Sequence, residues 1–351
     1  MPQAQQRILV SGAAGYLASW IVEELLRDGH TVHGTVRRLQ EHPKTQHLLD
    51  LADQYPERLR LFEADLLKEG SFDGAVEGCS AVIHTASPYF LSRPDDRERQ
   101  LIGPALRGTQ NVLASVKRSA TVRRVVLTSS IAALYNDARD VSRMGQQTLH
   151  EGNTNPNTHS GRNPYAYSKT VAEQAAWEQC RQQQRWDLVS ILPGAMFGPS
   201  RSKRPDSTSV TMMSQFVNGL YRRGVPRLWL GLVDVRDVAS AHVRAATLPQ
   251  AHHRYIAVAK SLRLLEIAQL MRVRDFGLED KLPRSEVPKM LMWLLGPAVG
   301  MQRHYVARNV GHPLSFDNRR SQTELGVRYR PPAETVNDHI RQLVADGLVP
   351  A

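Results

Sequence analysis

Tyr165 and Lys169 are the residues whose types and spacing most directly suggest chemistry. They lie four residues apart in the run NPYAYSKTVAEQAAW, and residues at i and i+4 project from one face of a helix. An adjacent fixed cation favours the phenolate form of a tyrosine, whose pKa is ordinarily ~10. The pair therefore predicts a proton donor together with the group that tunes it. The alternative is an ordinary surface helix, because the same spacing also arises by chance.

A glycine-rich loop near the N-terminus, VSGAAGYLAS, favours the catalytic interpretation. It follows an apolar run over residues 7–11 and opens a helical pattern over residues 16–28. Glycines at such a turn let the backbone approach a pyrophosphate, and the helix N-terminus offers free N–H groups. Ala18 replaces the third glycine, at a position that governs helix packing rather than phosphate approach. The loop residues expected at the cofactor are Gly12, Ala14, Gly15, Tyr16 and Leu17.

The end of the second predicted strand indicates which dinucleotide binds. An Asp or Glu there would hold the ribose 2′-hydroxyl of NAD, whereas this chain reads GTVRR, with Arg37 and Arg38 followed by Lys44. Guanidinium groups favour a 2′-phosphate. The sequence therefore predicts NADPH, with Arg37 and Lys44 at its phosphate. Two solvated arginines in a loop are the alternative.

The ends of the third and fourth strands supply further expected cofactor contacts. The adenine is expected beside Asp65 and Leu66 in FEADLL. The backbone is expected to pass the cofactor at Thr85, Ala86 and Ser87. The neighbouring His84 and Pro88 are interpreted as packing residues.

Length and charge bound the class of protein. A chain of 351 residues is long enough for one large α/β domain with an appendage. Lys and Arg exceed Asp and Glu by 45 − 34 = 11, and such a charge attracts anionic ligands. The cations are scattered rather than gathered in a tail or an aromatic-studded stripe. A phosphate-bearing cofactor and an acidic metabolite are therefore favoured over nucleic acid.

Cysteine usage and hydropathy predict a soluble, cytoplasmic protein. Cys79 and Cys180 cannot form a disulfide framework and lack the spacing of zinc ligands. The N-terminal MPQAQQ shows no secretory signal. The longest apolar stretch, residues 290–301, is too short to span a bilayer. It is interpreted as a core helix or a pocket lid rather than as a membrane anchor.

Short runs rich in Val, Ile and Leu alternate with helical patterns, which is typical of a parallel sheet covered on both faces. The sequence predicts a doubly wound, Rossmann-type α/β fold with about seven strands. The predicted strands are 7–11, 31–36, 59–63, 81–85, 123–129, 187–192 and 253–257. The predicted helices are 16–28, 43–54, 97–120, 164–184 and 235–248.

The alternation of strands and helices loosens after Pro193. Residues 198–204 are predicted to form a loop and residues 209–222 a helix, and beyond residue 262 helices with loops lead to a last helix over 332–346. We expect an NADP-binding domain of residues 1–193 plus 235–261. A smaller, mostly helical substrate lobe is expected to comprise residues 194–234 plus 262–351.

Several motifs occur in the order typical of one superfamily. The chain resembles the extended branch of the short-chain dehydrogenases/reductases in its glycine loop, Arg37, HTAS, TSS and YAYSK, over most of its length. It is most similar to the group of dihydroflavonol reductases, cinnamoyl-CoA reductases and related aldehyde and ketone reductases. That similarity lies in GTVRR, RLRLFEADLLKEGSFDGAVEGC, VIHTASP and SKTVAEQAAW. The resemblance implies NADPH as hydride donor and a carbonyl compound as acceptor.

The resemblance also implies catalytic roles. Tyr165 would be the general acid, and Lys169 would lower the pKa of Tyr165 and hold the nicotinamide ribose. Ser130 would hydrogen-bond the substrate oxygen, with Ser129 as its rival, because the following Ile-Ala-Ala aligns Ser130 with the catalytic serine of the family. A hydroxyl at this strand end suits developing alkoxide charge. Asn111, which could order a relay water in related enzymes, is interpreted as structural.

Two more segments, LPGAMFGP and VDVRDVASAH, also resemble the family. Pro193 and Gly194 in LPGAMFGP resemble the turn that packs on the nicotinamide carboxamide, with Ala195 and Met196 lining it. Thr128 is expected at the cofactor as well. No metal site is expected. The carboxylates of VDVRDVASAH, Asp234 and Asp237, are interpreted as loop-fixing or helix-capping groups, and the pair His252 and His253 as solvent-facing.

Two departures from the family pattern bear on the substrate. Plant dihydroflavonol reductases usually carry Asn or Asp five residues beyond the catalytic serine, where this chain has Tyr135. Cinnamoyl-CoA reductases carry NWYCYGK around the catalytic tyrosine, where this chain has NPYAYSK. The first departure argues against a flavonoid substrate, and the second argues against a CoA thioester. The loop cations Arg201, Lys203 and Arg204 could meet an acidic substrate.

The leading function is NADPH-dependent reduction of an aldehyde or ketone to the alcohol, with aromatic and acidic carbonyl compounds both as candidates. A sugar-nucleotide epimerase or dehydratase is one alternative, against which Arg37 argues because such enzymes usually carry an acidic residue there. A non-catalytic NADP sensor is the other, against which the retained Tyr165 and Lys169 argue. Extended relatives occur as monomers and as dimers, so both states remain open.

Overall fold

A seven-stranded parallel sheet forms the centre of the computed structural model, which describes residues 5–40, 42–87, 101–143, 145, 148–156, 163–202 and 207–349. The strand order is β10-β6-β5-β4-β1-β2-β3, and each neighbouring pair is parallel. The predicted Rossmann-type fold is thereby confirmed. The strands are β1 (Arg7–Ser11), β2 (Thr31–Val36), β3 (Leu59–Glu63), β4 (Ala81–His84), β5 (Arg124–Thr128), β6 (Asp187–Pro193) and β10 (His253–Ala257).

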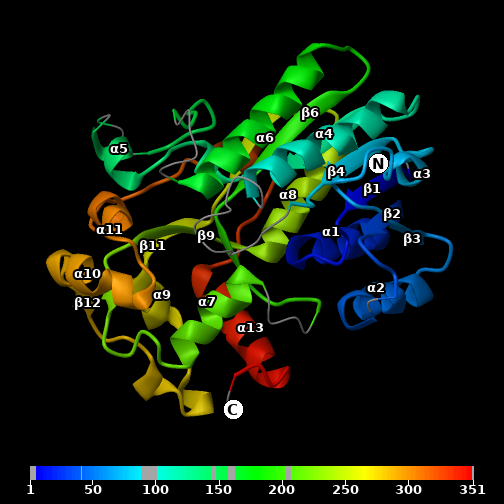
Figure 1. The fold of residues 1–351 in the computed structure, drawn as a ribbon. Helices are drawn as coiled ribbons and strands as arrows, with labels where there is room; N and C mark the ends of the chain where they lie inside the picture. Colours follow the sequence, from blue (N-terminus) through cyan, green and yellow to red (C-terminus); the bar gives the residue numbers. More distant parts are fainter. Residues whose placement is uncertain are drawn as a thin grey trace.

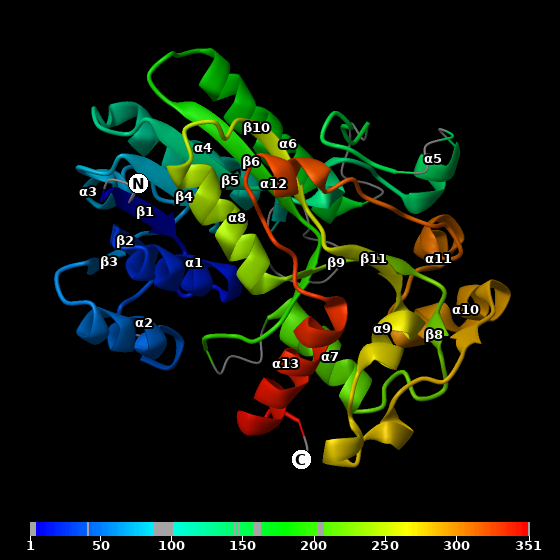
Figure 2. The same cartoon turned by 180° about the vertical axis from the view of Figure 1, so that it is seen from behind.

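Helices cover both faces of this sheet because its strands are apolar on both sides. Helices α4 and α6 lie on the near face in Figure 1, and α1 and α8 lie in front when the molecule is seen from behind in Figure 2. The middle of β1, Ile8 to Val10, is fully buried. The helices are α1 (Tyr16–Arg27), α2 (His42–Gln54), α3 (Asp73–Val76), α4 (Gly103–Arg118), α6 (Pro164–Arg181) and α8 (Val235–Thr247). The predicted helix over 97–120 begins later, at Gly103, and its residues 97–100 lie outside the described part of the chain.

A second, three-stranded sheet was missed by the sequence analysis. Its order is β11-β9-β7, with β9 antiparallel to β11 and parallel to β7. A two-stranded sheet pairs β12 with β8. The part after Pro193 is therefore not simply helical. The strands are β7 (Ala195–Phe197), β8 (Val225–Pro226), β9 (Trp229–Asp234), β11 (Lys260–Arg263) and β12 (Glu286–Val287).

A separate apolar core holds this second part together. It joins β9 to α7, α9 and α13, with Phe216, Ile267 and Ile340 among its buried side chains. The helices are α7 (Thr208–Val217), α9 (Leu264–Leu270) and α13 (Pro332–Ala345). The division of the chain at residues 193/194, 234/235 and 261/262 stays a prediction, and β11 already begins at Lys260.

The apolar segment at residues 290–301 is not a core helix, which corrects one of its two sequence interpretations. It forms α10 (Lys289–Leu295) and the 3₁₀ helix η6 (Gly296–Val299). Met292 is the one buried side chain of α10. Helix α10 packs against α11 (Arg303–Asn309), which in turn packs against α5 (Ala138–Arg143). Within the described ranges, no helix is both long and apolar enough to cross a membrane.

Candidate active site

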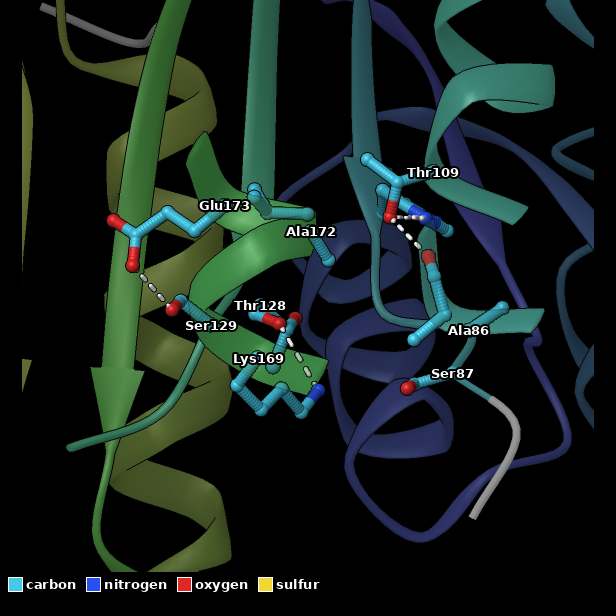
Figure 3. A pocket seen from close by; sticks show the side chains of 11 residues that line it. Ala86, Ser87, Thr109, Thr128, Ser129, Lys169, Ala172 and Glu173 are labelled. Atoms are coloured by element: carbon cyan, nitrogen blue, oxygen red, sulfur yellow. Dashed lines mark hydrogen bonds between the residues drawn. The ribbon is translucent and has the colours of Figure 1, made fainter. Parts of the chain in front are cut away.

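The ends of β4 and β5 and the first turns of α6 enclose a small cavity, shown in Figure 3. Its wall includes Ala86 and Ser87 after β4, Thr128 and Ser129 at the end of β5, and Lys169 on α6. This is the carboxyl edge of the parallel sheet, where open α/β folds bind their ligands. Segments that lie far apart in the sequence therefore meet at one edge.

Helix α6 carries the tyrosine and the lysine in its first two turns, and Lys169 lines the cavity. Asn163 is its N-cap, and the Asn163 side chain accepts a hydrogen bond of 3.1 Å from the backbone N–H of Ala166. Pro164 occupies the first turn, where its missing N–H costs nothing. The cap thereby fixes where the helix starts. It places Tyr165 in the first turn and Lys169 one turn later, both partly buried.

Burial and a neighbouring carboxylate act on the pKa of Lys169 in opposite directions. Its Nζ donates a hydrogen bond of 3.5 Å to the carbonyl oxygen of Thr128. Burial lowers the pKa of Lys169 to about 8, while the carboxylate of Glu173 acts in the opposite direction. Removing an ammonium from water disfavours its charged form, so the lowering follows from the partly apolar wall. Near neutral pH the side chain is still mostly an ammonium and can favour a phenolate beside it.

The two serines at the end of β5 have different partners. Ser129 donates a 2.6 Å hydrogen bond to Oε2 of Glu173. The Ser130 hydroxyl oxygen accepts a 3.1 Å hydrogen bond from the backbone N–H of Ala132, at the start of the 3₁₀ helix η3 (Ile131–Ala133). The Ser129 proton is therefore committed to a buried carboxylate. The Ser130 proton is not used in that backbone contact, which favours Ser130 as donor to a substrate oxygen.

Glu173 and Arg254 form a buried ion pair that sequence analysis did not single out. Their side chains are 5% and 16% exposed, and Arg254 Nε lies 2.8 Å from Glu173 Oε1. The Arg254 guanidinium also donates to the carbonyl oxygens of Glu151 and Asn153, each at 2.7 Å. The pair ties β10, α6 and the loop of Ser129 together. The two residues are 81 positions apart in the chain, so no local sequence pattern predicts the ion pair.

The glycine loop fits a pyrophosphate. Gly12 has φ +65°, and a Cβ there would lie 3.0 Å from the Cβ of Ala86. Gly15 is the N-cap of α1, which has no side-chain cap and no acidic residue in its first turn. The N–H groups of that turn therefore remain available for an anion. The Tyr16 hydroxyl donates to Gly198 O at 2.6 Å, and Leu17 is buried.

The strand next to the glycine loop ends in exposed cations. β2 ends at Val36, and Arg37 and Arg38 follow it as exposed residues. Within the described residues, Arg37 pairs with no carboxylate. Lys44 on α2 is exposed too. A guanidinium at this place suits a ribose 2′-phosphate.

Ser11 shapes the loop that follows β4. Its hydroxyl oxygen accepts hydrogen bonds of 3.1 Å from the backbone N–H groups of Thr85 and Ala86, and it lies 2.8 Å from Nδ1 of His84. Burial, together with the charge of Lys169, lowers the pKa of His84 to about 3. His84 is therefore neutral and acts in packing, as expected. Pro88 lies outside the described residues.

A buried histidine holds the Thr128 side chain. The Nδ1 of His242 lies 2.8 Å from the carbonyl oxygen of Val238, and its Nε2 lies 2.8 Å from the Thr128 hydroxyl. Burial lowers the pKa of His242 to about 4. Because a carbonyl only accepts, Nδ1 carries the proton and Nε2 accepts from Thr128. The carbonyl group of Thr128, rather than its hydroxyl, therefore meets Lys169.

The turn after β6 is a point of contact between the two sheets. The Gly194 N–H donates to Ala257 O at 3.0 Å. A Cβ at Gly194 would lie 2.1 Å from the carbonyl oxygen of Gly231 in β9, so only glycine fits. Pro193 is buried and Met196 is partly buried. Their expected contacts with the nicotinamide stay predictions.

Several of the candidate residues have partners within the protein, and the expected cofactor contact of Asp65 stays a prediction. The Asn111 side chain donates to Leu66 O at 2.7 Å, which fits the structural interpretation. The Asp65 carboxylate accepts from the N–H of Leu67. Arg201 forms an ion pair with Glu23 on α1 at 2.9 Å, and this pairing argues against a role in substrate binding. Residues 203 and 204, the other two loop cations, lie outside the described part of the chain.

The two candidate carboxylates after β9 also serve the fold. Asp234 caps α8 by accepting from the N–H of Arg236, and Asp237 accepts from the N–H of Arg330. Their structural interpretation holds. His252 and His253 are exposed, as expected. In the part of the chain that the structure describes, no cluster of His, Cys, Asp or Glu could hold a metal ion.

Aromatic side chains line the other side of the Ser130 loop. The Tyr135 ring lies 6.1 Å from that of Phe316. Burial raises the pKa of Tyr135, as do the neighbouring Tyr305 and Asp137. Tyr135 is therefore a neutral phenol packed against an apolar cluster that includes Phe316, five residues beyond Ser130.

Comparison with known proteins places these features in one family. The model described as "NAD dependent epimerase/dehydratase family" matches residues 8–259. A cinnamoyl-CoA reductase of Medicago truncatula is 39% identical over 268 residues, which are 76% of this chain and 79% of that protein. A tetraketide alpha-pyrone reductase of Arabidopsis thaliana is 34% identical over 354 residues, 99% of this chain and 98% of that protein.

A solved structure agrees over nearly the whole chain. The yeast methylglyoxal/isovaleraldehyde reductase Gre2, complexed with NADPH, is 28% identical with a TM-score of 0.76, covering 97% of this chain and 98% of that one. Its agreement extends past the family match into the second sheet and the last helices. The chain therefore belongs to the NAD dependent epimerase/dehydratase family, the extended short-chain dehydrogenases/reductases.

Proposed function

We propose that this protein is an NADPH-dependent reductase that converts an aldehyde or ketone to the alcohol. The observation that carries the proposal is the meeting of three elements at one cavity. Lys169 on α6, the serine-bearing end of β5 and the loop after β4 share its wall, and Tyr165 lies one turn before Lys169. The two plant relatives described above are reductases.

The cofactor proposal rests on three groups of residues. The uncapped N-terminus of α1 and the close approach at Gly12 suit the pyrophosphate. Arg37 suits the 2′-phosphate, and the structural relative Gre2 was solved with NADPH. When bound, NADPH supplies the hydride. The sugar-nucleotide epimerase alternative would call for an acidic residue where Arg37 stands.

Three side chains, those of Ser130, Tyr165 and Lys169, then take part in protonating the carbonyl oxygen. Ser130 donates a hydrogen bond to the carbonyl oxygen and stabilises the charge that develops there. Tyr165 gives its phenolic proton to that oxygen. Lys169, held by the carbonyl of Thr128, lowers the pKa of the Tyr165 phenol through its charge. Ser129 and Glu173 hold the end of β5 against α6.

The aromatic side chains beside the Ser130 loop indicate the class of substrate. Tyr135 and Phe316 form an aromatic surface beside the Ser130 loop. We propose an aromatic or apolar carbonyl compound, because Arg201, the described loop cation that could have met an acid, is engaged by Glu23. The free thiols of Cys79 and Cys180 fit the proposed cytoplasmic location. A monomer and a homodimer both remain compatible with the proposal.

The test is NADPH oxidation measured against a panel of aromatic aldehydes, diketones, dihydroflavonols and CoA thioesters. We expect turnover with aromatic aldehydes or ketones and a strong preference for NADPH over NADH. A parallel assay with UDP-sugars and NAD addresses the epimerase. Epimerisation without net NADPH oxidation would contradict the reductase proposal, as would absence of turnover with every carbonyl compound in a protein that binds NADPH.

A further inference from the structure

Helix α10 exposes large apolar side chains to an unusual degree. Among the described residues, eight large hydrophobic side chains are exposed, and six of them lie in α10 and α11. Those of α10 are between 44% and 85% exposed. Single exposed hydrophobic residues are normal, whereas a contiguous patch marks an interaction site. The patch consists of Met290, Leu291, Trp293, Leu294 and Leu295.

The exposure follows from how α10 is attached. Met292 alone is buried, in a small cluster with Val306 and Val310 of the neighbouring chain segment. The rest of the helix projects outward. In both Figure 1 and Figure 2, α10, α11 and α5 lie together along one edge of the molecule, away from the large sheet. The patch is therefore presented on a rim.

Positive charge borders the patch. Residues 287–316 contain no Asp or Glu. The guanidinium of Arg303 lies 4.8 Å from the centre of the Trp293 ring. Burial lowers the pKa of Lys289, and the charge of Arg139 on α5 lowers it further. Burial and then the charges of Lys289, Arg139 and Arg143 lower the pKa of His312.

These cations are not neutralised by their surroundings. The nearby carboxylates, Asp137 and Asp140, both pair with Arg308. Within the described ranges, Arg139 and Arg143 pair with no carboxylate, nor do Lys289 and Arg303. Like charges held close together without counter-ions favour an anionic partner.

We propose that α10 and its cationic border dock this protein on the surface of an anionic lipid bilayer. The apolar side chains would enter the boundary between headgroups and acyl chains, with the indole of Trp293 at headgroup level. Arg303 and Lys289 would reach the lipid phosphates, with Arg139 and Arg143 beside them. α10 has seven residues, so it lies on the membrane and does not span it.

A second copy of this chain fits the patch less well. Five side chains of this size expose on the order of 500 Å² together. A stable interface buries about 800 Å² on each partner. A two-fold contact through this rim would also bring the cations of one copy against those of the other. The observed charge favours phosphate headgroups as the opposing surface.

Vesicle sedimentation tests the proposal with the full chain. Vesicles of phosphatidylglycerol and phosphatidylcholine in equal parts should sediment the protein, and vesicles of phosphatidylcholine alone should do so much less. Raising the salt concentration should release it. Leu294→Ser combined with Leu295→Ser should weaken binding by about tenfold or more. Leu220→Ser is the matched control, since Leu220 is 60% exposed but follows α7 and is not part of the patch.

The cationic border is tested separately. Arg139→Gln combined with Arg143→Gln should weaken binding to the anionic vesicles and flatten its salt dependence, without changing the weak binding to phosphatidylcholine. The Trp293 emission should shift to the blue on vesicle binding, and that shift should be absent in Trp293→Phe. NADPH affinity, measured on every variant, checks that each one is folded.

Three outcomes would overturn the proposal: no sedimentation of the wild type with anionic vesicles, unchanged sedimentation of the double leucine variant, or equal binding to both kinds of vesicle. Sedimentation velocity without lipid tests the alternative that a second copy of this chain binds the patch. A dimer that Leu294→Ser dissociates would assign the patch to self-association instead. The result is independent of the proposed reductase activity, because the readout uses neither substrate nor cofactor turnover.

Discussion

Two regions of this molecule reverse the usual distribution of side chains. At the cavity, the buried carboxylate of Glu173 pairs with the largely buried guanidinium of Arg254. On the rim, α10 turns five large apolar side chains outward. Charged groups are ordinarily outside and large apolar groups inside. Hydrogen bonds from surrounding residues compensate for the burial of the charged pair. The described chain offers the exposed apolar side chains of α10 no comparable burial.

The difference indicates what each region is built for. The buried pair is satisfied by the backbone and by Ser129, so it orders the protein itself. The described part of the chain leaves the exposed patch largely uncovered, and we propose that its partner is a lipid surface. Variants of the interior should therefore change catalysis and stability, and variants of the rim should change neither.

The largest effect is expected at Tyr165. Tyr165→Phe should lower turnover by about a hundredfold or more, because the ring stays while the transferable proton is lost. NADPH affinity, measured by fluorescence titration, should stay nearly unchanged. Lys169→Ala should lower both turnover and NADPH affinity. A Tyr165→Phe variant with wild-type turnover would remove the catalytic assignment of α6.

The serine pair should respond unequally. Ser130→Ala should cost ~3 kcal/mol of transition-state stabilisation, the scale for one donor to a developing oxyanion. Ser129→Ala should lower turnover less, since the Ser129 proton is directed at Glu173. Steady-state kinetics of the two variants decide the assignment. The reverse order would exchange the roles of the two serines.

Glu173→Gln should shift the pH profile and lower the stability. The Glu173 carboxylate raises the pKa of Lys169, which lies at about 8. Its removal should lower that pKa, so the fall in activity on the alkaline side should begin at lower pH. Leaving Arg254 buried without a counter-charge should cost about 3 kcal/mol of unfolding free energy.

The control for that variant lies on the same helix. Glu178→Gln removes an exposed carboxylate that pairs with Arg181, at side-chain exposures of 58% and 64%. Surface pairs contribute little, so neither the pH profile nor the denaturation midpoint should move. Equal effects of the two substitutions would show that burial of the Glu173 pair is without consequence.

A smaller effect concerns the cofactor. Arg37→Ala should weaken NADPH binding by roughly tenfold to a hundredfold and leave NADH binding almost unchanged, because NADH has no 2′-phosphate. Raising the salt concentration should mimic the substitution in part, since Arg37 is exposed. Competitive titration of both dinucleotides measures this. Equal losses for both would revive the epimerase alternative.

The smallest effect is expected on the rim. Leu294→Ala should change the unfolding free energy by no more than ~0.5 kcal/mol, because Leu294 is 58% exposed. Met292→Ala, two residues away on the same helix, should cost about 2 kcal/mol because Met292 is buried. Chemical denaturation of both variants makes the comparison. A large loss in Leu294→Ala would mean that the protein itself covers the patch in solution.

The large sheet could be predicted from the sequence because its strands are buried on both faces and read as unbroken apolar runs, as in Ile8 to Val10. The three-stranded sheet and the two-stranded β12–β8 sheet could not. β7 has three residues, β8 and β12 have two each, and β9 is interrupted by Gly231. Such strands exist because a neighbouring strand pairs with them, and that information is not local.

The candidate site divides in the same way. Tyr165, Lys169 and the glycine loop are local patterns, so their spacing was sufficient to find them. Glu173 and Arg254 lie on α6 and β10 and become partners only when β10 pairs with β6. The exposure of α10 could not be predicted either, because an apolar run has the same sequence whether it is buried or exposed.

The contact at Gly194 limits how this protein can change over generations. A side chain there would collide with the carbonyl oxygen of Gly231, and Gly231 itself lies against Phe316 and Val258. The two sheets touch backbone to backbone at this point. A substitution at Gly194 would therefore require the backbone at Gly231 to move as well, so the two positions are expected to change together.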